Sequence, residues 1–255
     1  MQAALAGSKF YEAADKKIGV ILLHAYTGTP NDMNFLARRL NEAGCNVLCP
    51  LFKGHGTDDV QDIFRATTDD WWQQTQEIVS WAQRQGYQYL FIFGLSLGGM
   101  FATRALMEYQ EVFTGGGVFN SPVMATSKID VRATFMEYAQ YVYKRAGKLD
   151  QFAADQTKIE AGYDQQIAQI EAFRRQALDL YIDYTKPFYI CQSGSDELID
   201  EQEAFDLKNE LSNAQVSFHY FPNNTHVITV NKDREAFEAS VLDFIDQYAT
   251  TGLKK

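Results

Sequence analysis

The chain has few cysteines, few histidines and no long apolar run. Only Cys45, Cys49 and Cys191 are cysteines among 255 residues, and this odd, low number argues against a scaffold held by disulfides. We therefore expect reduced thiols and a cytoplasmic location, with Cys45 and Cys49 on the buried face of one strand. No window approaches the ~18 apolar residues of a membrane span, and the N-terminus lacks the charged start of a signal peptide. Stable membrane insertion is not expected.

Positive charge is also scarce. The chain carries 23 Lys and Arg against 33 Asp and Glu, a formal net charge of -10. Nucleic acids and anionic membrane surfaces attract basic proteins, so neither is expected as a partner. With 46% hydrophobic residues, a chain of this length can bury a sizeable core. It predicts one α/β domain, or one such domain with an insertion.

Strand-like and helix-like segments alternate along most of the chain. Apolar segments predict strands at 18–23, 45–49, 89–93, 117–120, 187–191 and 216–221. Capping residues and helical spacing predict helices at 29–44, 68–86, 99–107, 201–211 and 234–248. Repeated strand–helix units predict a mostly parallel central sheet with helices on both faces.

Residues 123–184 interrupt this alternation. They contain no convincing strand, and their apolar residues recur at helical spacing from Phe135 to Tyr181. We predict two or three amphipathic helices there, which are either ordinary core helices or a small cap over a functional site. The chain then divides into a core, residues 1–122 and 185–255, and a helical cap insertion, residues 123–184, placed before the strand at 187–191.

The most informative motif is Gly94-Leu95-Ser96-Leu97-Gly98. It follows the apolar strand at 89–93 and opens the helix at 99–107. Strand, G-x-S-x-G and helix together indicate a nucleophile elbow, a turn so sharp that its central residue is strained. A Cβ on either glycine would collide with the strand or the helix. The motif predicts Ser96 as a nucleophile at the C-terminal edge of the sheet.

A serine nucleophile needs a base, and this fold places the residues in the order Ser, Asp or Glu, His. Of the four histidines, only His226 lies in a loop after the last strand. His24 and His55 precede the elbow, and His219 alternates within the strand at 216–221. We therefore predict His226 as the general base and acid.

The orienting acid is expected in the loop after the strand at 187–191, because active sites form at that edge of such sheets. Asp196 is the predicted acid, and Glu197 and Asp200 are close alternatives. The oxyanion also needs two donors. We predict the backbone N–H of Leu97, which follows the nucleophile, and that of Tyr26, in the loop after the first strand.

No metal site is evident. The histidines are scattered, and the carboxylate pairs Asp58-Asp59 and Asp69-Asp70 are typical of turns and helix starts. The composition and spacing therefore indicate chemistry carried by side chains and backbone alone.

Several motifs resemble the bacterial carboxylesterase and monoacylglycerol lipase family of α/β hydrolases. The matching stretches keep the family's order along nearly the whole chain: Leu23–Pro30 (LHAYTGTP), Pro50–Thr57 (PLFKGHGT), Asp70-Trp71, Gly94–Gly99 (GLSLGG), Ser195–Glu197 (SDE) and Thr225-His226. The resemblance implies an α/β-hydrolase fold with Ser96, Asp196 and His226 as the triad. It also implies Tyr26 and Leu97 as the oxyanion hole, a cap at 123–184 over an acyl pocket, and no cofactor.

The same resemblance implies a serine carboxylesterase acting on short- to medium-chain esters or monoacylglycerols. Two positions depart from the family pattern: Ala25 stands where a glycine is usual, and Tyr26 where a phenylalanine is usual. The tyrosine is expected to bring a hydroxyl near the acyl pocket. The alternatives are a thioesterase, acyltransferase or C–C hydrolase with the same triad, or a non-catalytic ligand-binding protein of this fold. The partner is a small-molecule ester, and the protein is expected to be a monomer or homodimer.

Overall fold

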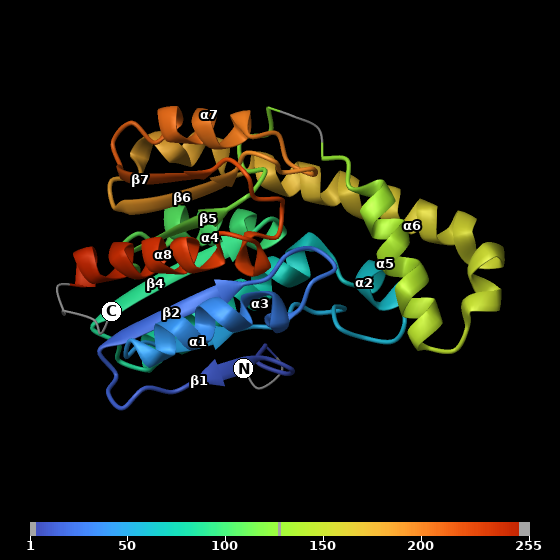
Figure 1. Cartoon of the computed structure of the whole chain (residues 1–255), viewed down its shortest axis with the longest axis horizontal. Helices are drawn as coiled ribbons and strands as arrows, with labels where there is room; N and C mark the ends of the chain where they lie inside the picture. Colours follow the sequence, from blue (N-terminus) through green and yellow to red (C-terminus); the bar gives the residue numbers. More distant parts are fainter. Residues whose placement is uncertain (1–3, 127–128, 250–255) are drawn as a thin grey trace.

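A single seven-stranded sheet organises the protein (Figure 1). The computed structural model describes residues 4–126 and 129–249. The strand order is β1-β3-β2-β4-β5-β6-β7. The strands are β1 (Lys9–Tyr11), β2 (Ile18–Leu23), β3 (Asn46–Cys49), β4 (Tyr89–Leu95), β5 (Gly115–Phe119), β6 (Pro187–Ser193) and β7 (Gln215–Phe221). Strands β2 to β7 pair in parallel, and β1 pairs antiparallel with β3.

Helices cover both faces of the sheet. They are η1 (Pro30–Met33), α1 (Asn34–Glu42), α2 (Gln61–Arg65), α3 (Thr68–Arg84), α4 (Leu97–Glu108), α5 (Arg132–Arg145), α6 (Leu149–Arg175), η2 (Leu178–Asp183), α7 (Gln202–Glu210), η3 (Ile228–Val230) and α8 (Arg234–Ala249). Apolar residues of α1 and α8 share one core cluster, and those of α3, α4 and α7 share the other. The predicted mostly parallel sheet with helices on both faces is therefore confirmed.

The central strands are apolar on both sides because both faces of the sheet are covered. In β4, Leu90 and Ile92 belong to one core cluster, whereas Phe91, Phe93 and Leu95 belong to the other. This continuous apolar pattern made the central strands easy to predict from the sequence.

The carboxyl ends of the parallel strands are aligned at one edge of the sheet. Leu23 of β2 pairs with Gly94, and Leu95 of β4 pairs with Phe119. Phe119 in turn pairs with Cys191 of β6. The loops after β2, β4, β5, β6 and β7 consequently meet at this edge, which is where ligands bind in open α/β sheets.

Residues 123–184, which we call the insertion, connect β5 to β6. Their described residues form α5, α6 and η2 and no strand, and α5 and α6 pack together away from the sheet (Figure 1). The C-terminal end of α6 is joined to α7 by a buried ion pair, in which the Arg174 guanidinium lies 3.5 Å from the Glu203 carboxylate. Arg174 also lies 2.6 Å from Glu171. The insertion therefore has a fixed attachment to the core on its C-terminal side.

Three short elements, β1, α2 and η3, were not predicted. Strand β1 has three residues with an intermediate, exposed, intermediate burial pattern, and α2 has five residues. None of the three is long enough to produce a periodic pattern in the sequence. Helix α3 begins at Thr68, as predicted, with Thr67 as its N-cap in a capping box with Asp70.

None of the helices in the described residues is both long and apolar enough to cross a membrane.

Candidate active site

Ser96 occupies the turn between β4 and α4 with φ 52° and ψ -118°. Such a conformation costs a non-glycine residue about 1–3 kcal/mol and persists only where its surroundings hold it. A Cβ on Gly94 would lie 2.1 Å from the carbonyl carbon of Gly98. A Cβ on Gly98 would lie 2.3 Å from the carbonyl oxygen of Leu23 in β2. Glycine is therefore required at both positions, against α4 and against β2.

His226, in the loop after β7, contacts Asp196, in the loop after β6. The imidazole Nδ1 lies 2.9 Å from each carboxylate oxygen of Asp196. The two side chains are only 4% and 1% exposed. Asp196 Oδ1 also accepts the N–H groups of Leu198 (2.9 Å) and Ile199 (3.0 Å), which fixes the carboxylate. With Nδ1–H donated to Asp196, the Nε2 lone pair remains for accepting a proton.

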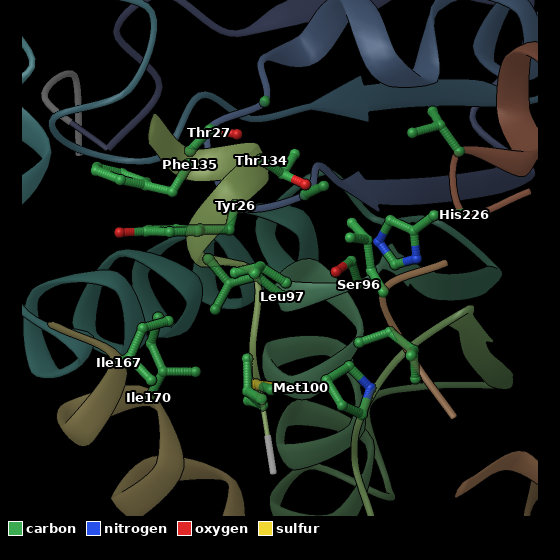
Figure 2. Close-up of a pocket in the computed structure, with 18 of the residues that line it drawn as sticks. Tyr26, Thr27, Ser96, Leu97, Met100, Thr134, Phe135, Ile167, Ile170 and His226 are labelled. Carbon is green, nitrogen blue, oxygen red and sulfur yellow. The ribbon is translucent and has the colours of Figure 1, made fainter. Parts of the chain in front are cut away.

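Ser96 and His226 line the same cavity, and Figure 2 shows the Ser96 hydroxyl directed into it. The structure thus brings together the three residues that the sequence places about 100 and 30 positions apart.

The two alternative acids have other contacts. Glu197 Oε2 accepts the backbone N–H of His226 at 3.0 Å rather than an imidazole hydrogen. Asp200 Oδ1 accepts the N–H of Gln202 at the start of α7 at 3.0 Å. Only Asp196 among these three carboxylates is placed to orient the imidazole.

His24, directly after β2, is a buried residue whose ring nitrogens bond to the backbone. It is fully buried, its Nδ1 donates to the Ala25 carbonyl (2.8 Å), and its Nε2 accepts the Phe52 N–H (3.0 Å). Burial lowers the pKa of His24 to about 4, because the charged imidazolium would be desolvated.

This pKa predicts loss of stability in mild acid. A pKa lowered on folding means that the unfolded state binds the proton more tightly, so the stabilisation is present above pH ~6.5 and is lost as the pH falls through ~4. The loss is on the order of 3 kcal/mol. Denaturant titrations of the wild type and His24→Gln at about pH 7 and about pH 4 would measure it. The wild type should lose more unfolding free energy than the variant, and equal losses would contradict the assignment.

The remaining two histidines, His55 and His219, do not line the cavity either. His55 is buried beside His24, with ring centroids 5.0 Å apart, and burial lowers its pKa well below the usual value. His219 stacks on Tyr189 at 4.9 Å in the edge strand β7.

The two predicted oxyanion donors, Leu97 and Tyr26, line the same cavity as Ser96. Leu97 is the first residue of α4, where backbone N–H groups have no partner within the helix. Tyr26 lies in the loop after β2, and both residues line the cavity (Figure 2). The cavity beside Ser96 is therefore bordered by a helix N-terminus, which favours negative charge, and by the loop after β2.

The cavity beside Ser96 has a volume of about 280 Å³. This is at the lower end of the ~300–1,000 Å³ typical of small-molecule sites. Its wall is mainly apolar and is shared by α4, the insertion and the loop after β6; it includes Met100, Phe135, Ile167, Ile170, Leu198 and Ile199. Half of these residues belong to the insertion. Across residues 4–126 and 129–249, no three His, Cys, Asp or Glu side chains gather as metal ligands would.

Comparison with known proteins shows the family to which the chain belongs. The model of the family described as serine aminopeptidase, S33, matches residues 14–233. The chain belongs to this family. Together with the relatives named below, the match confirms the resemblance found in the motifs.

Members and neighbours of the family match over almost their full lengths. A carboxylesterase of Bacillus subtilis (strain 168) is 24% identical over 241 residues, 93% of this chain and 95% of the relative. A thermostable monoacylglycerol lipase of Bacillus sp. (strain H-257) is 27% identical over 252 residues, 96% and 97% of the two chains. A solved structure from work on the metagenome-derived lipolytic enzymes LipS and LipT has a TM-score of 0.74 at 20% identity, covering 94% of this chain and 97% of that one. The α/β-hydrolase fold is thereby confirmed.

The departure at Tyr26 has a clear structural consequence. The Tyr26 hydroxyl donates to Gln166 Oε1 of α6 at 2.6 Å, and Gln166 Nε2 donates to the carbonyls of Ile63 (2.6 Å) and Ala66 (3.0 Å). The ring stacks on Phe135 with centroids 5.5 Å apart. The Tyr26 hydroxyl is therefore hydrogen-bonded to the insertion. The Tyr26–Gln166 hydrogen bond connects the loop after β2 to α6.

Asp32 also lines the cavity and was missed as a site residue. The sequence indicated only an acid in a first helical turn. A Cβ on Gly28 would lie 1.9 Å from Asp32 Oδ2, so this carboxylate packs directly against the loop that carries Tyr26. Burial raises the pKa of Asp32 to about 6. The sequence contained no sign of this contact, because it depends on how the loop folds back onto η1.

Proposed function

We propose that this protein is a serine carboxylesterase that hydrolyses short- to medium-chain carboxylic esters or monoacylglycerols through an acyl-enzyme intermediate. The observation that carries the proposal is the contact of His226 Nδ1 with both Asp196 oxygens, at 2.9 Å, where Ser96 and His226 open onto one apolar cavity. The family, and the carboxylesterase and lipase among its relatives, support an ester-hydrolysing serine hydrolase.

Acylation begins when His226 Nε2 takes the proton of Ser96 Oγ as that oxygen attacks the ester carbonyl. The backbone N–H groups of Leu97 and Tyr26 bind the oxyanion that forms, each contributing about 3 kcal/mol of transition-state stabilisation. Asp196 holds the imidazole and stabilises its positive charge. The bond from the carbonyl carbon to the alcohol oxygen then breaks, and the alcohol leaves with the proton from His226.

Deacylation repeats the cycle with water. His226 accepts a proton from water as the hydroxyl oxygen attacks the acyl carbonyl, and the same N–H groups bind the second oxyanion. The bond to Ser96 Oγ breaks, and Ser96 recovers its proton from His226. The carboxylic acid is released.

The insertion, residues 123–184, serves as a cap that shapes the acyl site. Support comes from Ile129, Phe135, Ile167 and Ile170, which contribute apolar side chains to the cavity wall. An apolar wall binds an acyl chain because each methylene group that it buries contributes about 0.8 kcal/mol of binding free energy. The small cavity favours short and medium chains over long ones.

This role predicts that narrowing the cavity changes chain-length preference. Ile167→Phe should exclude about two methylene groups, which lowers kcat/KM for an octanoate ester about tenfold and for an acetate ester less than threefold. The matched control is Ile182→Phe, because Ile182 belongs to the insertion but is 59% exposed. Equal losses on both esters in Ile167→Phe would argue against an acyl site at this wall.

The experiment that tests the proposal is hydrolysis of p-nitrophenyl esters from acetate to palmitate, beside thioester and amide analogues. We expect a maximum of kcat/KM at short or medium chains. A serine-reactive phosphonate that labels the protein without any ester turnover would favour a thioesterase, acyltransferase or C–C hydrolase. Preference for the amide would favour a peptidase, and a lack of labelling would favour a ligand-binding protein.

We further propose a cytoplasmic monomer or homodimer. Cys45, Cys49 and Cys191 are all buried free thiols, and burial raises the pKa of Cys45 and of Cys49 to about 12. Such thiols suit a reducing compartment and need no disulfide partner. Light scattering of the purified protein would distinguish monomer from dimer.

A further inference from the structure

Asn120 stands directly after β5, at the edge of the sheet where Ser96, Asp196 and His226 meet. It is fully buried and has a φ of 45°. Few non-glycine residues adopt positive φ, although asparagine does so more readily than most. A residue with a strained backbone persists only where surrounding contacts hold it in place, and Asn120 has such contacts.

The side chain of Asn120 uses both its polar atoms. Oδ1 accepts the backbone N–H of Ser193 at 2.8 Å. Nδ2 donates to Ser193 Oγ at 2.9 Å and to the carbonyl oxygen of His226 at 2.5 Å. The amide therefore forms a bridge between the last residue of β6 and the residue predicted as the base.

This bridge joins the three segments that carry the site. Ser193 is three residues before Asp196. Phe119, the neighbour of Asn120, accepts the backbone N–H of Ser96 at 2.9 Å through its carbonyl. One side chain and its neighbour thus connect the loops after β4, β6 and β7.

His226 needs such support because it lies between β7 and the short helix η3, outside both. Its backbone N–H donates to Glu197 Oε2 at 3.0 Å, and its carbonyl accepts from Asn120 and from the N–H of Ile228 at 3.0 Å. Glu197 is exposed, whereas Asn120 is fully buried. A hydrogen bond away from water is electrostatically stronger, so Asn120 is the firmer anchor.

We propose that Asn120 is a positioning residue for catalysis: it holds the backbone of His226 so that Nδ1 faces Asp196 and Nε2 faces the Ser96 side of the cavity. This inference rests on the proposed serine-esterase function. Asn120 does not contact the substrate and acts through His226. Because a displacement of about 1 Å at a reacting group costs about 100-fold in rate, loosening this loop should slow the chemical step.

Asn120→Gly removes the bridge and leaves a backbone that adopts positive φ freely. The matched control is Asn46→Gly, at the start of β3. Asn46 is 4% exposed. It accepts the Ala13 N–H at 3.1 Å and donates to the carbonyls of Asp15 (2.6 Å) and Ile18 (3.3 Å). Both variants lose a buried amide with a similar number of bonds, and only one of the amides touches the site.

The readouts are kcat and KM on a p-nitrophenyl ester, the melting temperature, and the downfield proton resonance of the His226–Asp196 hydrogen bond. For Asn120→Gly we expect kcat to fall about 10- to 100-fold with KM changed less than about threefold, and the resonance to shift or broaden. Asn46→Gly should lower the melting temperature comparably and leave kcat and the resonance unchanged.

Wild-type kcat in Asn120→Gly, or equal losses of kcat in the two variants, would overturn the positioning role. If the wild type hydrolyses no ester, the proposed function fails instead. The resonance then still decides the inference: an unchanged signal in Asn120→Gly would show that the imidazole is held without Asn120.

Discussion

Ser96→Ala is expected to lower kcat for ester hydrolysis by about a million-fold. The side chain oxygen that would form the acyl-enzyme is lost, and removal of a triad nucleophile in serine hydrolases has an effect of this size. A residual acceleration of about 10³–10⁴ over the reaction in water should remain, because the oxyanion donors and the cavity are intact. Steady-state rates on a p-nitrophenyl ester measure the loss.

The same variant controls for folding. Alanine retains the Cβ of Ser96, so it occupies the turn with φ 52° without further steric demand. The melting temperature should therefore stay within a few degrees of the wild-type value. Phosphonate labelling should disappear. A folded Ser96→Ala protein with more than about 1% of wild-type activity would exclude Ser96 as the nucleophile.

Asp196→Asn is expected to lower kcat by about 10⁴-fold. The asparagine amide can donate to His226 Nδ1, which moves the imidazole hydrogen to Nε2 and leaves no lone pair there for the Ser96 proton. The backbone bonds from Leu198 and Ile199 to Oδ1 can be kept by the asparagine oxygen. The loop should thus remain folded while the chemistry fails, with KM little changed.

Asp200→Asn is the matched control for the acid. Asp200 is exposed and accepts the N–H of Gln202 at the start of α7. We expect its kcat to stay within about threefold of the wild type, with stability little changed, because the asparagine oxygen can still accept the Gln202 N–H. A 10⁴-fold loss in Asp200→Asn or in Glu197→Gln, with an active Asp196→Asn, would reassign the acid.

Two of the links between the insertion and the core involve α6. The Tyr26–Gln166 bond joins α6 to the loop beside Ser96. The Arg174–Glu203 pair joins the C-terminal end of α6 to α7. Arg174, Glu203 and Gln166 are buried, so removing a partner of any of them leaves a buried polar group without its bond, which is destabilising.

The sequence predicted the elements whose signals are local. The apolar strands β2, β4 and β6 are long and buried on both faces, and Thr29 and Gly44 mark helix ends by their own backbone preferences. The elbow was equally clear, since strand, glycine spacing and helix are contiguous. Strand β1 and helix α2 were missed because a few half-buried residues carry no periodicity.

By itself the sequence predicted the fold class, the strained serine turn and His226 as the candidate base. The strands, the helices and the serine turn depend on residues close together in the chain, and the choice of His226 depends on the order of the histidines along it. Only the tertiary structure distinguished Asp196 from Glu197 and placed Asp32 at the cavity. It also joined Asn120 to His226 and Tyr26 to Gln166, 106 and 140 positions apart. Contacts of this kind arise from how strand ends and the insertion come together. No residue pattern encodes them, since hydrogen bonds form wherever packing leaves a buried polar group in need of a partner.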